Sequence, residues 1–146
     1  MSNEQDVYFL RMREDAKVPT YSHPTDCCAD LYSADDVTIK PGERKLVDTG
    51  IAVEMPEGFE IQIRPRSGIA WNNGITVLNS PGTIDEPYRN SLKVILINLG
   101  DKPYTICVGD RIAQAKLSPV YKMNFIEKSS LSDTDRGLTG FGNTGK

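Results

Sequence analysis

The stretch NSPGTIDEPYRNSLKVILIN, residues 79–98, joins a turn, a loop of reactive side chains and a buried strand. Its Ser-Pro-Gly turn at 80–82 fixes one backbone angle at the proline and frees the next at the glycine. The run from Leu92 to Leu99 is apolar and rich in β-branched residues, which predicts a buried strand. The loop between them carries carboxylates, an aromatic ring and a guanidinium: Asp85, Glu86, Tyr88 and Arg89. Functional groups are often held this way beside a rigid scaffold, although a surface hairpin with solvated charges is the simpler interpretation of this stretch alone.

On either side of this stretch, short apolar runs alternate with turns about every eight to twelve residues, a pattern typical of an all-β sandwich or barrel. The cleanest alternation is Phe59 to Arg64, which we expect to form an antiparallel hairpin with the run 46–55 across the turn at 56–58. One helical turn is predicted at 67–71. Further strands are expected at 7–13, 29–33, 37–39, 75–78, 92–99, 104–107, 112–117 and 120–126.

Length and composition favour a single domain of 146 residues. The net charge is −3 and the isoelectric point is near 5.2, without a lysine-arginine block, so we expect no nucleic-acid partner. No apolar run is long enough to span a membrane, and no secretion leader is visible. A cytoplasmic location is therefore expected, in the host cell if the source is a virus.

Cysteine and histidine usage argues against several kinds of catalytic site. The cysteines are Cys27, Cys28 and Cys107, an odd number without zinc-ligand spacing, and small thiols in a reducing compartment are the expected interpretation. His23 is the only histidine and precedes a proline in a turn-like segment. A Ser-His-Asp or Cys-His nucleophile therefore has little support.

Two segments carry features of anion binding. Arg66 and Ser67 stand where a helical turn is predicted to begin, so a guanidinium, a hydroxyl and free N–H groups can converge on one anion; a simple helix start explains them equally. Residues 127–146 are rich in Ser, Thr, Asp and Gly and predict a flexible tail. That tail nevertheless contains Arg136, the isolated Phe141 and four glycines in RGLTGFGNTG, a composition that can wrap phosphates once ordered.

Three acidic residues lie beside predicted turns: Asp30, Asp85 and Asp110. Magnesium usually keeps several waters and is bound through one or two carboxylates together with substrate phosphates. One or two of these acids would therefore suffice for a magnesium-triphosphate site, although surface turns acquire acids by chance as well.

Taken together, five blocks resemble the trimeric deoxyuridine triphosphate nucleotidohydrolases, or dUTPases, in the order and spacing of that family. They span nearly the whole chain, and their combination is far more specific than any one of them. The blocks are ADLYSA at 29–34, PRSGIA at 65–70, NSPGTIDEPYR at 79–89, GDRIAQ at 109–114 and RGLTGFGNTG at 136–145.

The resemblance implies a distorted, mostly antiparallel jelly-roll subunit with one short helix, assembled as a homotrimer. Residues 1–126 would form this single β domain. Residues 127–146 would be a flexible glycine-rich arm that closes the active site of a neighbouring subunit. The implied activity is Mg²⁺-dependent hydrolysis of dUTP to dUMP and pyrophosphate by water attack on the α-phosphorus, which supplies dUMP for thymidylate synthesis and keeps uracil out of DNA.

The resemblance also implies a role for individual residues. Asp85 would orient and deprotonate the attacking water, Tyr88 would pack under the deoxyribose, and Asp30 would accept hydrogen bonds from magnesium-bound waters. Base and sugar recognition would involve Asn79, Gly82, Thr83, Ile84, Tyr88, Lys93 and Phe141. Phosphate binding would involve Arg66, Ser67, Gly68, Gln114, Arg136, Gly142, Asn143 and Thr144.

Three positions depart from the family pattern, which usually has glycine at Cys28 and Thr139 and serine at Asn143. Two alternative functions remain open from sequence. A deoxycytidine triphosphate deaminase shares the fold, but it needs an acid/base group near the pyrimidine C4, and the Tyr-Arg pair at 88–89 matches the hydrolase better. A nucleotide-gated regulator acting through a protein partner is the other alternative.

Overall fold

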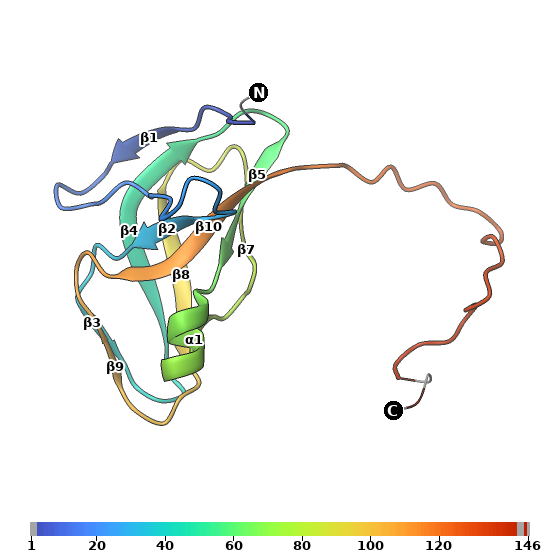
Figure 1. Ribbon diagram of the computed structural model, residues 1–146. Coiled ribbons are helices and arrows are strands. Elements are labelled where there is room, and N and C mark those ends of the chain that lie inside the picture. Colours follow the sequence, from blue (N-terminus) through green and yellow to red (C-terminus); the bar gives the residue numbers. More distant parts are fainter. Residues whose placement is uncertain (1–2, 143–144, 146) are drawn as a thin grey trace.

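Eleven regular elements make up the computed structural model, which describes residues 3–142 and 145 (Figure 1). Nearly all of them are strands, as the alternating sequence pattern predicts. They are β1 (Tyr8–Arg11), β2 (Ala29–Tyr32), β3 (Val37–Ile39), β4 (Arg44–Glu54), β5 (Phe59–Arg64), α1 (Ser67–Asn73), β6 (Ile75–Val77), β7 (Gly82–Ile84), β8 (Ser91–Asn98), β9 (Tyr104–Ile106) and β10 (Arg111–Pro119).

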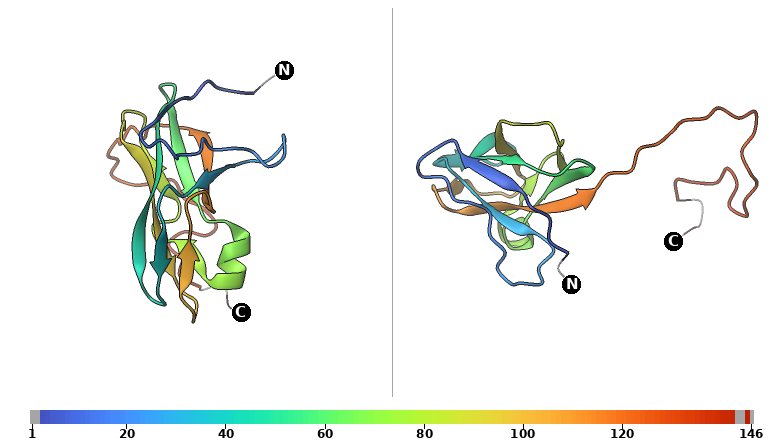
Figure 2. Two further views of the ribbon diagram at one scale, coloured as in Figure 1. Left: turned by 90° about the vertical axis from the view of Figure 1, so that its left-hand side faces the viewer. Right: turned by 90° about the horizontal axis from the view of Figure 1, so that it is seen from above.

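The strands form two four-stranded antiparallel sheets and one small ribbon (Figures 1 and 2). One sheet has the order β1-β4-β8-β6, the other has the order β2-β10-β5-β7, and β3 pairs with β9. Apolar side chains from the facing sides of both sheets make one core, in which β8 contributes Leu92 and Leu96 and β5 contributes Ile61 and Ile63. The predicted all-β, jelly-roll-like fold with one short helix is confirmed.

The predicted hairpin between residues 46–55 and 59–64 is wrong. Both strands form, but β4 pairs with β1 and β8, whereas β5 pairs with β10 and β7. The turn at 56–58 therefore carries the chain from one sheet to the other. The physical reason is burial on both sides of β4, where the consecutive residues Ile51, Ala52 and Val53 are all buried. A strand covered on both faces must lie inside the sandwich rather than in a half-exposed hairpin.

The predicted strand over 120–126 does not form. After Pro119 the backbone leaves the β domain and runs outward toward the C-terminal end of the chain (Figures 1 and 2). Tyr121, Met123 and Phe125 are largely exposed, because the segment lies against no sheet edge. Conversely, the short strand β7 was not predicted, since its Gly-Thr-Ile sequence is too brief to show alternation.

The short helix α1 begins after Arg66 and ends at Gly74, close to where sequence placed it. Gly74 adopts a left-handed conformation with φ of 71° and closes the helix with backbone hydrogen bonds to Ile69 and Ala70. A β-carbon at Gly74 would approach the backbone nitrogen of Gly100 to 2.5 Å. Only glycine therefore allows α1 to turn tightly back into β6.

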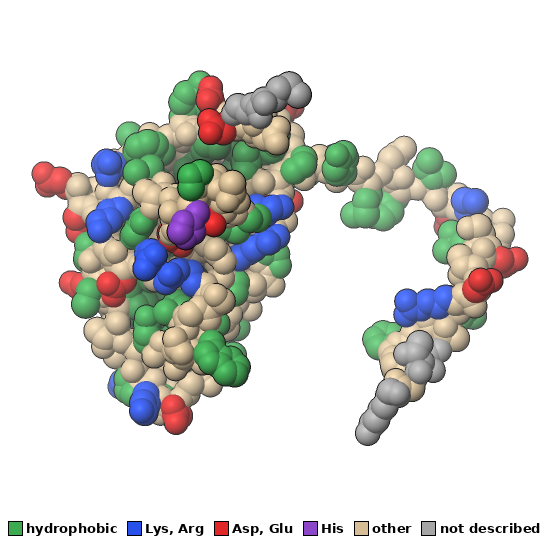
Figure 3. Space-filling view, in the orientation of Figure 1, with side chains coloured by type: hydrophobic (Ala, Val, Ile, Leu, Met, Phe, Trp, Pro, Cys, Tyr) green, Lys and Arg blue, Asp and Glu red, His purple; other side chains and the backbone are tan. Residues whose placement is uncertain are grey.

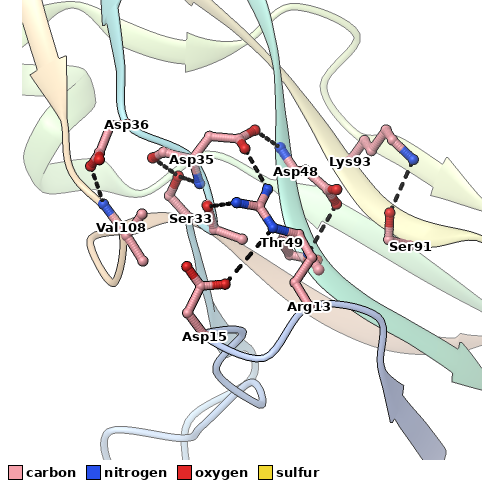
Figure 4. A network of polar contacts seen from close by, with 12 residues as sticks. Arg13, Asp15, Ser33, Asp35, Asp36, Asp48, Thr49, Ser91, Lys93 and Val108 are labelled. Atoms are coloured by element: carbon pink, nitrogen blue, oxygen red, sulfur yellow. Dashed lines mark hydrogen bonds and ion pairs between the residues drawn. The ribbon is translucent and has the colours of Figure 1, made fainter.

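A polar network ties the N-terminal segment to β4 and to the residues after β2 (Figure 4). The Arg13 guanidinium lies 2.5 Å from the Asp35 carboxylate and also donates to the carbonyl of Ala34. Asp35 in turn accepts a hydrogen bond from the backbone N–H of Asp48 at 2.9 Å. Burial raises the pKa of Asp35, but the hydrogen bonds from Asp48 and Arg13 outweigh it, so the pKa is lowered overall. In the part of the chain described here, no helix is long and apolar enough to cross a membrane.

Candidate functional site

A polar hollow of about 350 Å³ opens on the outer face of the sheet that contains β2, β10 and β5. Gln114 on β10 is directly opposite Asp30 on β2 and Arg64 on β5, so the three side chains lie in one row on the same face. Figure 3 shows lysine and arginine side chains gathered around the single histidine on this side of the molecule. The lining residues are Ser22, Asp26, Cys27, Cys28, Asp30, Arg64 and Gln114.

Asp30 is nearly buried and surrounded by donors. Its carboxylate accepts a hydrogen bond from the Ser22 hydroxyl at 3.0 Å and lies 3.5 Å from the Arg66 guanidinium. A second guanidinium, that of Arg111, is 3.6 Å away. This acid is thus held between two cations, and positive charge gathered in this way favours the binding of a polyanion.

The predicted phosphate residues of the PRSG block flank this hollow. Gln114 donates its amide N–H to the carbonyl of Pro65 at 3.0 Å, which fixes the backbone just before α1. Ser67 and Gly68 are exposed at the first turn of α1, and Arg66 points back to Asp30. The structure therefore brings together Asp30, Arg66 and Gln114, with Ser67 and Gly68 adjacent to them in the chain.

The predicted base and sugar residues form a separate group on the loop from Asn79 to β8. Asn79 lies beside Gly82, because a β-carbon placed at Gly82 would be 3.7 Å from the Asn79 amide nitrogen. Thr83 and Ile84 belong to β7, which pairs with β5 on the side that β10 does not occupy. Asp85 is exposed, so its carboxylate is accessible to water and ligand.

Two further predicted residues are anchored to the start of β8. The Tyr88 hydroxyl donates to the carbonyl of Ser91 at 2.8 Å, and the ring is 37% exposed. Lys93 donates to the Ser91 hydroxyl at 3.0 Å. The bond from Tyr88 anchors its hydroxyl at the start of β8 and leaves part of the side chain exposed, where a sugar can pack.

The Asp30 group and the Asp85 group lie at different strands of one sheet, because β7, which leads to Asp85, pairs with β5 on the side away from β10. The C-terminal arm carries a third set of predicted site residues, and it extends away from the β domain (Figure 1). Its Arg136 donates to the carbonyl of Thr139 within the arm, and Phe141 is fully exposed. Gly142 has φ of 81°; the predicted phosphate residues Asn143 and Thr144 lie outside the described residues.

Sequence reasoning missed Arg64, Arg111 and Ser22 as neighbours of the predicted site. Arg64 lines the hollow, and its guanidinium donates to Gln62 at 3.0 Å. Strand alternation predicts that Arg64 faces outward, but only the cross-strand register with Gln114 brings it to the hollow. Arg111 is also part of the GDRIAQ block, but Ser22 lies in a loop whose path has no sequence signal.

Asp110 has a structural role rather than a place beside Asp30. Its carboxylate accepts the backbone N–H of Cys107 at 2.8 Å and so closes the turn before β10. Burial and the charge of Asp110 raise the pKa of the nearby Tyr104, while Arg66 opposes the shift. Among the residues described, no group of three histidine, cysteine or acidic side chains is arranged to hold a metal by itself.

Comparison with known proteins shows which family the chain belongs to. The family model for dUTPase matches residues 14–145. The chain belongs to the dUTPase family. A deoxyuridine 5'-triphosphate nucleotidohydrolase of Nautilia profundicola is 52% identical over 136 residues, covering 93% of this chain and 96% of the relative. One from Hydrogenobaculum is 55% identical over 136 residues, covering 92% and 94%.

The fold of this dUTPase chain also matches solved structures. The Staphylococcus bacteriophage 80alpha dUTPase with bound dUPNHPP superposes with a TM-score of 0.86 at 26% identity, covering 99% of this chain and all of that chain. The predicted family is therefore confirmed, and these relatives favour a dUTP nucleotidohydrolase over a deaminase.

Proposed function

We propose that this chain hydrolyses dUTP to dUMP and pyrophosphate, which supplies dUMP for thymidylate synthesis and keeps uracil out of DNA. The observation that carries the proposal is the hollow in which Asp30 sits between Arg66 and Arg111, with Gln114 beside it. Two guanidiniums and one carboxylate suit a magnesium-bound triphosphate better than a neutral or singly charged ligand.

Asp85 acts as the general base. Its exposed carboxylate takes a proton from water, the oxygen attacks the α-phosphorus, and the bond from that phosphorus to the bridging oxygen breaks. Phosphoryl transfer depends on positioning and charge stabilisation, so a covalent nucleophile is unnecessary. This agrees with a site that offers carboxylates and guanidiniums around the substrate rather than an activated serine or cysteine.

Selectivity for the base and the sugar lies on the loop before β8. Asn79 and the backbone of Gly82, Thr83 and Ile84 read the uracil edge, and Lys93 supports the loop through Ser91. Tyr88 packs under the deoxyribose, where a ribose 2′-hydroxyl would clash. The hydrogen bond from Tyr88 to Ser91 fixes the ring in the orientation that this exclusion requires.

The residues of the hollow fit magnesium carried by the substrate. Asp26 and Asp30 are its only lining carboxylates among the residues described, and magnesium is commonly held by one or two carboxylates, waters and substrate phosphates. Asp30 would accept hydrogen bonds from waters on the ion. When bound, the ion neutralises developing phosphate charge. Arg66, Ser67, Gly68 and Gln114 hold the phosphates directly.

We propose that a complete site uses more than one chain. The Asp30 group and the Asp85 group lie at different strands of one sheet, and the arm extends away from both (Figure 1). We place these sets together at the contacts of a homotrimer. There, the arm of a neighbour closes over the ligand through Arg136, Phe141, Gly142, Asn143 and Thr144.

The position of bond cleavage is tested by turnover in water enriched in heavy oxygen, with mass spectrometry of both products. Attack on the α-phosphorus places the heavy oxygen in dUMP, which is the expected result. Heavy oxygen in pyrophosphate would mean attack on the β-phosphorus, and the roles assigned to Asp85 and the hollow would be wrong.

Sharing of the site between chains is tested by mixing two inactive variants, Asp85→Asn and Arg66→Gln, through joint refolding. Each variant refolded alone serves as the control. If the two groups meet at a subunit contact, random assembly of an equal mixture gives about a quarter of all sites both native residues, and these sites recover activity. Recovery no greater than the sum of the two controls would place each site within one chain.

A further inference from the structure

Two adjacent free thiols lie on the wall of the phosphate hollow. Cys27 is exposed and Cys28 is half-buried, and both line the cavity together with Asp30 and Gln114. Cys28 directly precedes β2 and stands two residues before Asp30, and the bend at Cys27 and Cys28 brings both thiols to the wall of the hollow that Asp30 lines. The proposed reaction uses neither thiol.

The environment of the pair keeps Cys28 as a neutral thiol next to its neighbour. Burial raises the pKa of Cys28, the hydrogen bond and charge of Cys27 raise it further, and Arg64 and Lys116 oppose the shift. Because the two cysteines are consecutive in the chain, free and on the wall of one hollow, an atom that bonds two sulfurs can reach both of them. A simple nucleophilic role for Cys28 is disfavoured, because nucleophilic attack needs the thiolate.

We infer that Cys27 and Cys28 form a dithiol site for thiophilic ligands that bind two sulfur atoms at once, such as trivalent arsenicals, and that its occupancy blocks the phosphate hollow. The two sulfur donors of the pair match the number that a trivalent arsenical needs. An arsenic atom that carries one organic group completes its three bonds with two thiols. Among the described residues, the pair belongs to no group of three histidine, cysteine or acidic side chains that could hold a metal ion, as a protein-held metal would usually require.

The bonding step is a balanced condensation. With phenylarsine oxide, the arsenic–oxygen bond breaks and two arsenic–sulfur bonds form. Both thiol protons leave with the oxygen as one water molecule, and no atom changes oxidation state. The group formed would stand on the hollow wall, close to the Asp30 carboxylate and the Gln114 amide that hold magnesium waters and phosphate. Conversely, a bound triphosphate would shield the thiols.

The experiment treats the full-length protein with phenylarsine oxide in the presence of excess 2-mercaptoethanol, a monothiol. Intact-mass measurement and peptide mapping then locate the adduct. Cys107 supplies the matched control, because it is an exposed cysteine that has no adjacent thiol. The variants are Cys27→Ser, Cys28→Ser and Cys107→Ser, and each is compared with its own untreated sample.

We expect one adduct that resists the monothiol in the native protein and in Cys107→Ser, and none in Cys27→Ser or Cys28→Ser. Dithiothreitol should remove the adduct, and a non-hydrolysable imido analogue of dUTP should slow its formation. A resistant adduct on Cys107, or none on the pair, would overturn the dithiol site. The mass measurement decides this part independently of any enzymatic activity.

The blocking effect rests on the proposed function. With dUTP as substrate, the adduct should lower turnover at least about tenfold in the native protein, and dithiothreitol should restore it. Cys28→Ser should be insensitive to the reagent. Unchanged turnover despite a complete adduct would overturn the block, whereas untreated protein without any dUTP turnover would instead contradict the proposed function.

Discussion

Asn98 provides the most quantitative test of how β8 is anchored. Its side chain is completely buried at the end of β8. The amide nitrogen donates to the carbonyls of Ile39 and Lys102, each at 2.8 Å, and the amide oxygen accepts the backbone N–H of Gly100 at 2.9 Å. One side chain thus satisfies three backbone groups, a buried one on β3 and two on the turn after β8.

Replacing Asn98 with leucine preserves approximate size and removes all three hydrogen bonds. At about 1 kcal/mol for each bond, the free energy of unfolding should fall by about 3 kcal/mol. This is a large share of the roughly 5–15 kcal/mol that stabilises a typical domain. With a urea dependence of about 2 kcal/mol per molar, the midpoint should fall by about 1.5 M.

The assay is urea unfolding followed by far-ultraviolet circular dichroism, at one fixed protein concentration because an oligomer's stability depends on concentration. The matched control is Asn72→Leu, an exposed position on α1, which should change the free energy by less than about 0.5 kcal/mol. If Asn98→Leu shifted the midpoint no more than this control, the three hydrogen bonds would not anchor β8 as described.

Three further predictions concern catalysis, acid stability and the arm. Asp85→Asn should lower turnover by roughly 10²-fold or more with nearly unchanged nucleotide affinity, since only the base is lost; unchanged turnover would remove Asp85 from that role. Asp35→Asn should lower the urea midpoint near pH 7. Because the folded-state pKa of Asp35 lies below its ordinary value of 3.8, its stabilisation is complete above that value and disappears as pH falls through the folded-state pKa. The difference between variant and native protein should therefore vanish in strong acid, and a constant difference would contradict the role given to the Asp35 charge. Deleting residues 136–146 should abolish most activity while light scattering still reports a folded trimer, since the described arm residues contribute nothing to the buried core; full activity would show that the arm is idle.

Local sequence patterns predicted the elements of the fold much better than their partners. The alternation in Phe59–Arg64 identified β5 correctly, with Ile61 and Ile63 buried as expected. The same pattern gave the wrong partner, because a turn between two strands does not reveal whether the chain stays in one sheet or crosses to another. That choice depends on which apolar faces the remaining strands cover, and these strands are far apart in sequence.

The segment 120–126 illustrates the same limit. Its apolar residues have the composition of a strand, yet Tyr121 and Phe125 remain exposed because no edge lies beside them in the chain. Composition reports the ability to pair, whereas pairing also requires a neighbouring backbone.

The sequence motifs predicted most residues of the candidate site, but they did not predict how these residues lie relative to one another. The signatures around Asp30, Arg66 and Gln114 identified residues that the structure brings together at one hollow. Sequence did not indicate that Arg64 and Ser22 would join them, because cross-strand register and loop path decide those contacts. It also gave no direct sign that two adjacent thiols would face the same hollow.

The most direct test of the central claim is product analysis on purified protein with Mg²⁺, offering dUTP, dTTP, dCTP and UTP separately. We predict pyrophosphate release from dUTP alone, since Asn79 and its neighbours exclude the thymine methyl and the cytosine amine and Tyr88 excludes the ribose. Deaminated nucleotide from dCTP, or binding of dUTP without turnover, would contradict the account and favour a deaminase or a nucleotide-gated regulator respectively.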